Sequence, residues 1–174
     1  MSSGSAVIRT TGSWKRPIAW LPRPLLEPGQ PLKTLAFGWA LAFIPSLALA
    51  AAVALLLPDV PRPELGITGP VAVGLMVVFA PVVETLVMGA VLSGLLRFVP
   101  PTVAVLISAA GWGMLHSLSA AAWGLVIWWP FIIFSTIFVT WRQRSWLAGF
   151  GMAAATHALH NLVPALALLA AAKA

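Results

Sequence analysis

The stretch LAFGWALAFIPSLALAAAVALLL, residues 35–57, runs for 23 residues without one charged side chain. About 20 consecutive apolar residues are enough for an α-helix to cross the hydrocarbon core of a bilayer. The whole chain has the same character, because 60% of its 174 residues are hydrophobic and only 8% are charged. A soluble domain carries about 25% charged residues. This composition excludes a water-soluble globular domain and indicates an integral membrane protein.

Apolar runs of this kind occur five times in the sequence. They cover about Lys33–Pro58, Gly69–Leu96, Thr102–Leu118, Ala121–Thr140 and Leu147–Ala172. None alternates between apolar and polar residues with a period of two, which argues against a transmembrane β-barrel. The sequence therefore predicts an all-α, polytopic transmembrane helix bundle with about five spans. Residues 1–32 are predicted to form a basic cytoplasmic leader, and residues 33–172 the transmembrane domain.

Positive charge is concentrated outside the apolar runs. The chain has ten Lys and Arg against four Asp and Glu, and a formal charge of +6. Anionic membrane lipid is therefore the expected partner of these charges, and nucleic acid is not. With the leader inside, eight of the ten positive residues lie on the inner side, which predicts a cytoplasmic N-terminus and an outer C-terminus. The lack of cysteine excludes disulfides and thiolate metal sites, and no pattern defines the oligomeric state.

Four ionisable side chains lie deep inside the predicted spans: Glu84 in the second, His116 in the third, and His157 and His160 in the fifth. An ionisable group in hydrocarbon costs on the order of 3 kcal/mol unless it is paired or faces water. Pro81 precedes Glu84 by three residues, removes a backbone donor and loosens the helix there. A loosened helix beside a carboxylate predicts a cavity at this point.

Helical spacing places some of these groups together. His116 follows Trp112 by four residues, and Asn161 follows His157 by four, so each pair lies on one helix face. His160 is rotated from His157 by about 60°. Each group alone is also compatible with an interhelical hydrogen bond that stabilises packing. However, three different spans each supply a group that can bind a proton. This coincidence favours one shared functional site over separate packing contacts.

Three stretches of the sequence carry a resemblance to a known family. They are APVVETLVMGAVLSGLL, SAAGWGMLHSL and AATHALHNL. In this order, with a predicted helix between the second and the third, they resemble the Glu-Glu-x-x-x-Arg, Phe-x-x-x-His and His-x-x-x-Asn motifs of the CAAX-prenyl-protease and bacteriocin-processing (CPBP) family of glutamic intramembrane proteases. The resemblance spans about Val71–Leu166 and predicts a CAAX-protease-like core.

The resemblance implies an intramembrane endopeptidase that hydrolyses a peptide bond near the membrane in a protein or peptide substrate. Glu84 would be the general base for the attacking water, and His116 would position or activate this water. His157 and Asn161 would stabilise the tetrahedral oxyanion. The resemblance implies no organic cofactor and no metal, and it favours a location in a bacterial inner membrane.

The chain departs from the family pattern at three positions. Thr85 stands where the family has its second Glu, Gly89 where it has Arg, and Trp112 where it has Phe. Loss of one carboxylate together with one cation preserves the local charge balance. These departures leave open a non-catalytic membrane binding or immunity protein of the same fold.

Two other chemistries also remain open. Glu84 and two of the histidines are enough ligands for a zinc ion with one open position, although the sequence contains no HExxH motif. A serine protease would need a hydroxyl near a histidine. The candidates are Ser93, Ser108, Ser117 and Ser119, although small hydroxyls commonly pack helices in membranes.

The predicted bundle contains one geometric conflict. At 1.5 Å per residue, Glu84 lies about 22 Å below the outer end of a second span that begins at Gly69, whereas His116 lies near the outer end of the third. Either the start of the second span protrudes or bends at Pro81, or the third helix extends beyond Ser119. We expect the first, because proline is a common cause of a bend.

Overall fold

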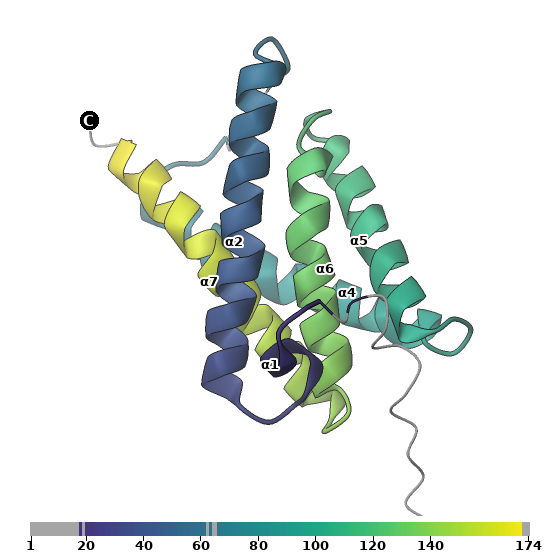
Figure 1. Cartoon of the computed structure of the whole chain (residues 1–174). Coiled ribbons are helices and arrows are strands. Elements are labelled where there is room, and N and C mark those ends of the chain that lie inside the picture. Colours follow the sequence, from purple (N-terminus) through teal and green to yellow (C-terminus); the bar gives the residue numbers. More distant parts are fainter. Residues whose placement is uncertain (1–17, 19, 62, 64–65, 172–174) are drawn as a thin grey trace, which may run out of the picture.

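The computed structural model describes residues 18, 20–61, 63 and 66–171. Every regular element in these residues is a helix, and Figure 1 shows how they are arranged. In chain order they are α1 (Arg23–Leu26), α2 (Pro31–Leu56), α3 (Gly69–Gly74), the π-helix η1 (Leu75–Phe79), α4 (Ala80–Leu95), α5 (Pro101–Ser117), α6 (Gly124–Trp141) and α7 (Trp146–Ala171). The all-helical prediction is confirmed for the described residues. Each long helical run begins and ends within three residues of its predicted span.

Four of the described helices are long and apolar enough to cross a membrane: α2, the continuous run Gly69–Leu95, α6 and α7. Their length and composition are those of an integral membrane protein. The predicted third span corresponds to α5, which at 17 residues is shorter than any of these four. The structure thus supports four of the five predicted spans, and a crossing by α5 stays a prediction.

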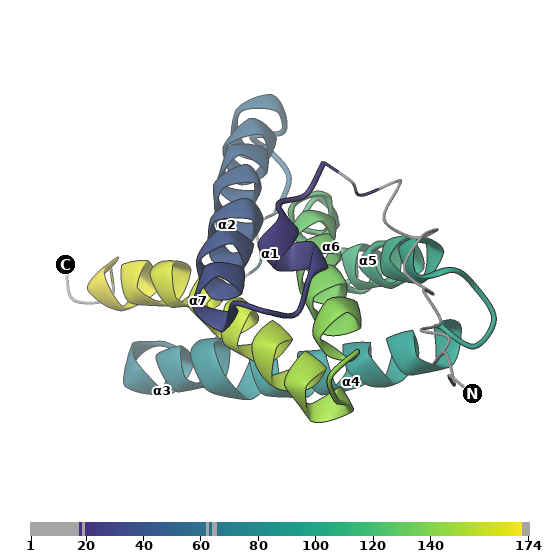
Figure 2. The same ribbon diagram turned by 60° about the horizontal axis from the view of Figure 1, so that its bottom comes forward.

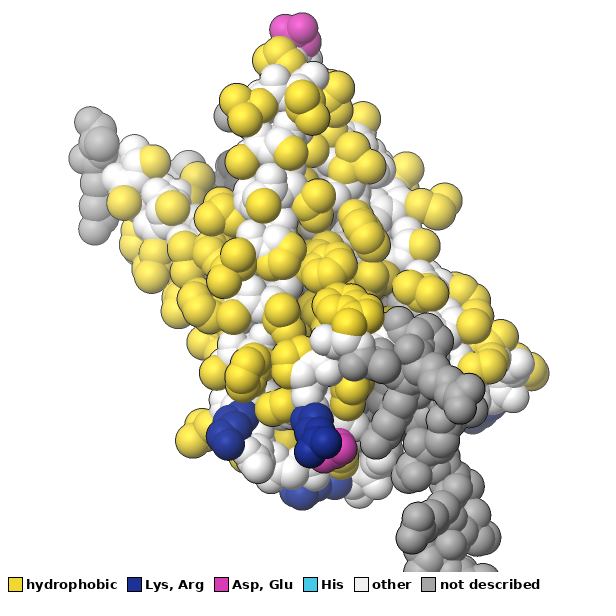
Figure 3. Space-filling view, viewed as in Figure 1, with side chains coloured by type: hydrophobic (Ala, Val, Ile, Leu, Met, Phe, Trp, Pro, Cys, Tyr) yellow, Lys and Arg dark blue, Asp and Glu magenta, His cyan; other side chains and the backbone are white. Residues whose placement is uncertain are grey.

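The central helix of the bundle is α6, which contacts α1, α2, α4, α5 and α7. Over an apolar stretch of 18 residues, 78% of the α6 residues are buried, against 11% of the α2 residues. The sequence FIIFSTIFVTW (131–141) is apolar or carries a small hydroxyl at every position, and a helix that is apolar all round is typical of a buried place. Exposed apolar side chains of the other helices cover the surface seen in Figure 3. In a membrane these outer faces contact lipid.

Two close approaches between helices depend on glycine. Gly38 of α2 faces α6 and α7, and a Cβ at this position would stand 2.7 Å from Ile137 Cδ1 and 3.0 Å from Thr156 Cγ2. Gly124 at the start of α6 lies against the main chain of Gly113 in α5, so that a Cβ there would overlap the Gly113 carbonyl oxygen. Small residues at such positions let helix backbones approach closely in lipid. They bring α2, α5 and α7 tightly around α6.

The run Gly69–Leu95 is inclined to α2 and α6, as Figures 1 and 2 show, and it packs mainly against α7. Its helical backbone continues through Pro81, which stands in the first turn of α4 directly after η1. An inclined helix descends less than 1.5 Å per residue along the axes of its neighbours. Glu84 therefore reaches the level of His116, and both line one cavity. Inclination of the run accounts for the meeting of Glu84 and His116, and the expected protrusion or bend at Pro81 stays a prediction.

The described part of the predicted leader is packed against the bundle. Four of its apolar side chains are buried: Ile18, Leu21, Leu25 and Leu26. Thr140 Oγ1 of α6 donates a hydrogen bond of 2.8 Å to the Leu25 carbonyl oxygen. Trp20 stacks on Trp129 with the ring centroids 5.8 Å apart. This docking was not predicted, because proline and arginine divide the apolar residues of the leader into short groups.

We expect Thr140→Val to lower the free energy of unfolding by about 1–2 kcal/mol, because the buried Leu25 carbonyl oxygen would lose its donor. Thr136→Val is the matched control, since the Thr136 hydroxyl donates to the Ile132 carbonyl oxygen within α6, which the helix ladder also serves. Thermal unfolding in detergent compares the two variants. Equal losses would show that the leader contact contributes no stability of its own.

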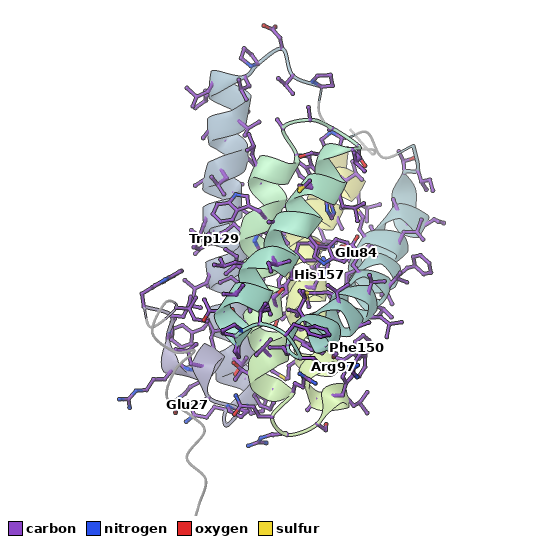
Figure 4. All side chains as sticks on the ribbon, turned by 90° about the vertical axis from the view of Figure 1, so that its right-hand side faces the viewer. Glu27, Glu84, Arg97, Trp129, Phe150 and His157 are labelled. Carbon is purple, nitrogen blue, oxygen red and sulfur yellow. The ribbon has the colours of Figure 1, made fainter. Side chains whose placement is uncertain are left out.

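The described Lys and Arg side chains gather at one end of the molecule. Figure 3 shows them at the lower end, and Figure 4 labels Arg97 and Glu27 toward the same end. Because α2 begins and α6 ends there, Lys33 and Arg142 belong to this group. The remaining positive residues lie outside the described residues, and they are Arg9, Lys15, Arg16, Arg62 and Lys173. The described charges are consistent with the one-sided distribution on which the topology prediction rests.

Candidate functional site

A cavity of about 480 Å³ lies among α4, α7 and the facing ends of α5 and α6. Glu84, His116, His157 and Asn161, the four predicted site residues, all line it. Glu84 comes from α4 and His116 from the last turn of α5, whereas the other two come from α7. Figure 4 shows Glu84 and His157 next to each other between their helices. The structure therefore brings the predicted residues together, and their catalytic roles stay predictions.

Two ionisable side chains approach each other in the cavity, Glu84 and His157. Glu84 Oε2 lies 3.7 Å from His157 Nε2. This separation exceeds the 2.7–3.2 Å that is usual for a direct hydrogen bond, at about the range where a bridging water has to be considered. The His157 side chain is 5% exposed and that of Glu84 26%. The imidazole is thus held inside the bundle, while the carboxylate remains accessible from the cavity.

Aromatic side chains of α6 hold the His157 ring in place. Phe134 stacks on it with the centroids 4.5 Å apart and an interplanar angle of 21°. Phe131 meets it edge-on at 5.5 Å and also stacks on Trp112 at 4.6 Å. Trp112 therefore connects α5 to the same wall. These rings fix the orientation of the imidazole and leave the cavity largely apolar around its few polar groups.

The ring of His116 is oriented by its own helix. His116 Nδ1 lies 2.9 Å from the Trp112 carbonyl oxygen, one turn earlier in α5. Since a carbonyl oxygen only accepts, Nδ1 carries the proton and donates. In the neutral imidazole Nε2 then keeps its lone pair and can accept a proton or orient a water.

Asn161 makes a hydrogen bond to the main chain of another helix. Its Nδ2 donates to the Met76 carbonyl oxygen at 2.9 Å, and Met76 belongs to η1. The side chain lines the cavity, but one of its two amide hydrogens is directed at the backbone. The predicted donation to an oxyanion therefore competes with a contact that the sequence pattern did not show.

A third imidazole also lines the cavity. His160 was not among the predicted site residues, yet it is buried and contributes to the cavity wall. Phe43 and Phe134 meet its ring edge-on at 5.9 and 5.6 Å. Its Nδ1, like that of His157, has no hydrogen-bond partner among the described residues. His157 and His160 are separated by about 60° around α7, and the cavity is wide enough for both rings to reach it. The spacing of the two residues in the sequence does not indicate this width.

Two of the three positions that depart from the motif pattern, Thr85 and Gly89, are packed away from solvent. Thr85 is fully buried, and its Oγ1 has no hydrogen-bond partner among the described residues. At Gly89 a Cβ would stand 2.7 Å from Phe138 Cε2 and 3.2 Å from Trp146 Cζ2. No side chain of the size of arginine fits there without moving these rings. Helix packing thus occupies the place where the family has its cation.

The geometry bears differently on the two other chemistries. Among the described residues no three His, Asp or Glu side chains form a group that could hold a metal ion. Ser93 Oγ donates to the Gly89 carbonyl oxygen at 2.6 Å, and Ser108 is hydrogen-bonded to Ser135. Of the four candidate serines Ser119 lines the cavity.

Comparison of the chain with protein-family models, curated proteins and solved structures found no match. The resemblance to the CPBP family therefore rests on the motif residues alone.

Proposed function

We propose that the protein is an intramembrane endopeptidase that uses water activated by Glu84. The observation that supports this most directly is the 3.7 Å approach of Glu84 and His157 in a cavity that His116 and Asn161 also line. A carboxylate, imidazoles and an amide that converge from three helices are enough for hydrolysis without an organic cofactor. The large apolar part of the cavity wall suits a peptide segment that arrives from the membrane.

The proposed reaction is the hydrolysis of one peptide bond. Glu84 accepts a proton from water, whose oxygen attacks the scissile carbonyl carbon, and His116 Nε2 orients this water. His157 donates a hydrogen bond to the oxygen that becomes negative. The proton on Glu84 then passes to the leaving nitrogen as the carbon–nitrogen bond breaks, which gives a carboxylic acid and an amine. We assign the oxyanion donor to His157, because the hydrogen bond to Met76 takes one of the two Asn161 amide hydrogens and fixes the direction of the other.

The proposed setting follows from the arrangement of charge and apolar surface. The end that carries Lys33, Arg97 and Arg142 faces the cytoplasm and contacts anionic lipid headgroups. This orientation fits a bacterial inner membrane, with α5 as a fifth, shorter crossing. The substrate is a protein or peptide segment near its membrane anchor.

The test of this function is a comparison of membrane-protein termini by mass spectrometry in cells with the wild-type gene, Glu84→Ala or no copy. We expect new termini in the wild type alone, with the same uncleaved precursors in the other two. Identical profiles in all three would instead support a non-catalytic binding protein, which the packing of Gly89 against Phe138 also favours. A chelator should leave the cleavage unchanged, and loss of cleavage on chelation would indicate the zinc-dependent alternative.

A further inference from the structure

Pro45 in α2 shows how this chain treats a proline inside a membrane helix. The N–H of each helical residue bonds to the carbonyl oxygen four residues earlier, and proline has no N–H. The carbonyl that lacks a donor is therefore that of Leu41. Trp129 Nε1 from α6 donates to this oxygen at 2.7 Å. A neighbouring helix thus replaces the donor that the proline removes, as hydrocarbon surroundings require.

Pro81 creates the same shortage in η1. The N–H of Ala80 bonds to the Leu75 carbonyl oxygen, five residues earlier. In this π-helical pattern the Met76 carbonyl oxygen would take its hydrogen from residue 81, where the proline has none. The donor of Ala80 is already engaged. Asn161 Nδ2 from α7 donates to Met76 in its place, at 2.9 Å.

We infer that Asn161 is a positioning residue that supplies the donor missing at Pro81 and so fixes α7 against η1. The inference rests on the proposed function in one respect, namely that the positioned groups are Glu84 and His157. Glu84 lies about one turn after Pro81, and His157 lies one turn before Asn161. The hydrogen bond therefore joins the two helices close to the point where the carboxylate and the imidazole meet at 3.7 Å.

The two prolines and their two donors allow a crossed rescue experiment. Asn161→Ala should lower the unfolding temperature in detergent by about 5 °C, the scale of one buried hydrogen bond in a chain of this size. Pro81→Ala in the same chain should restore it, because residue 81 then has an N–H for the η1 carbonyls. Pro45→Ala should not restore it. Conversely, Trp129→Phe should be rescued by Pro45→Ala and not by Pro81→Ala.

The crossed pattern decides the inference without any substrate. If the effects of Asn161→Ala and Pro81→Ala simply add, or if both prolines rescue both variants equally, the pairing of Asn161 with Pro81 is wrong. If Asn161→Ala alone does not accumulate as folded protein, recovery of folded protein in the Pro81→Ala background is the same rescue. Absence of that recovery overturns the inference.

A kinetic readout separates positioning from direct catalysis. With a substrate found by the comparison of termini, Asn161→Ala should lower kcat by about tenfold and leave KM nearly unchanged, and Pro81→Ala should recover kcat. A double variant that regains stability but not kcat would show that the amide acts on the substrate itself. If the wild type cleaves nothing, the proposed function fails, while the thermal experiment still decides the role of Asn161.

Discussion

We expect Glu84→Gln to reduce peptide hydrolysis by about 10²–10⁴-fold, the usual contribution of a general base, while the protein stays folded. The amide has nearly the shape of the carboxylate but cannot take a proton from water. Asp59→Asn is the matched control, because this carboxylate is exposed beyond the end of α2 and does not line the cavity. Cleavage of an identified substrate by purified protein in detergent measures both variants.

The Glu84 experiment has a clear contrary result. Full turnover by Glu84→Gln would remove the carboxylate from the mechanism, whatever the other cavity residues do. An equal loss of hydrolysis in Asp59→Asn would show that the effect comes from the removal of a negative charge or from the preparation of the protein, and not from the position of Glu84. Thermal unfolding of all three proteins establishes that the comparison is made between folded states.

The second large effect is expected at the contact between α5 and α6. Gly124→Ala would place a methyl group on the Gly113 carbonyl oxygen and beside Ser117 Oγ. Backbone atoms cannot relieve the overlap by a change of rotamer, as a flexible side chain can. The two helices would therefore have to separate. We expect a loss of about 3 kcal/mol or more in the free energy of unfolding. Because His116 stands between Gly113 and Ser117, the cavity would be disturbed as well.

Gly111→Ala is the control for this substitution. Gly111 is also in α5, but a Cβ there meets nothing within 4 Å, and alanine in place of a helical glycine is favourable by up to about 1 kcal/mol. Yield of monodisperse protein and unfolding temperature in detergent compare the two variants. Similar behaviour of both would contradict the close approach at Gly124.

The helices and the gathering of the site residues could be predicted from the sequence for a simple physical reason. A bilayer demands long apolar runs with no charge, so the bounds of α2 and α7 are local properties of composition. Ionisable groups such as Glu84 and His157 are costly in hydrocarbon unless they share a cavity. Their position inside the runs therefore already predicted that they would meet.

Other features depend on contacts between distant parts of the chain. Asn161 and Met76 are 85 residues apart, and no local pattern indicates that one donates to the other. The Gly69–Leu95 run likewise packs against α7, which is distant in the sequence, and its own apolar pattern does not indicate its inclination. The share of His160 in the cavity depends on the width of the space between helices, which helical spacing does not define.

The hydrogen bond from Thr140 to Leu25 joins residues 115 positions apart, which affects the order of events during synthesis. A ribosome that adds 5–20 residues per second needs roughly 6–23 s to reach Thr140 after Leu25 has been made. Throughout that interval the nascent N-terminal segment can pack against α2 but not against α6, and the apolar side chains that α6 later covers are available to the translocation machinery or to chaperones. Completion of α6 is therefore the moment at which this segment can take its final place.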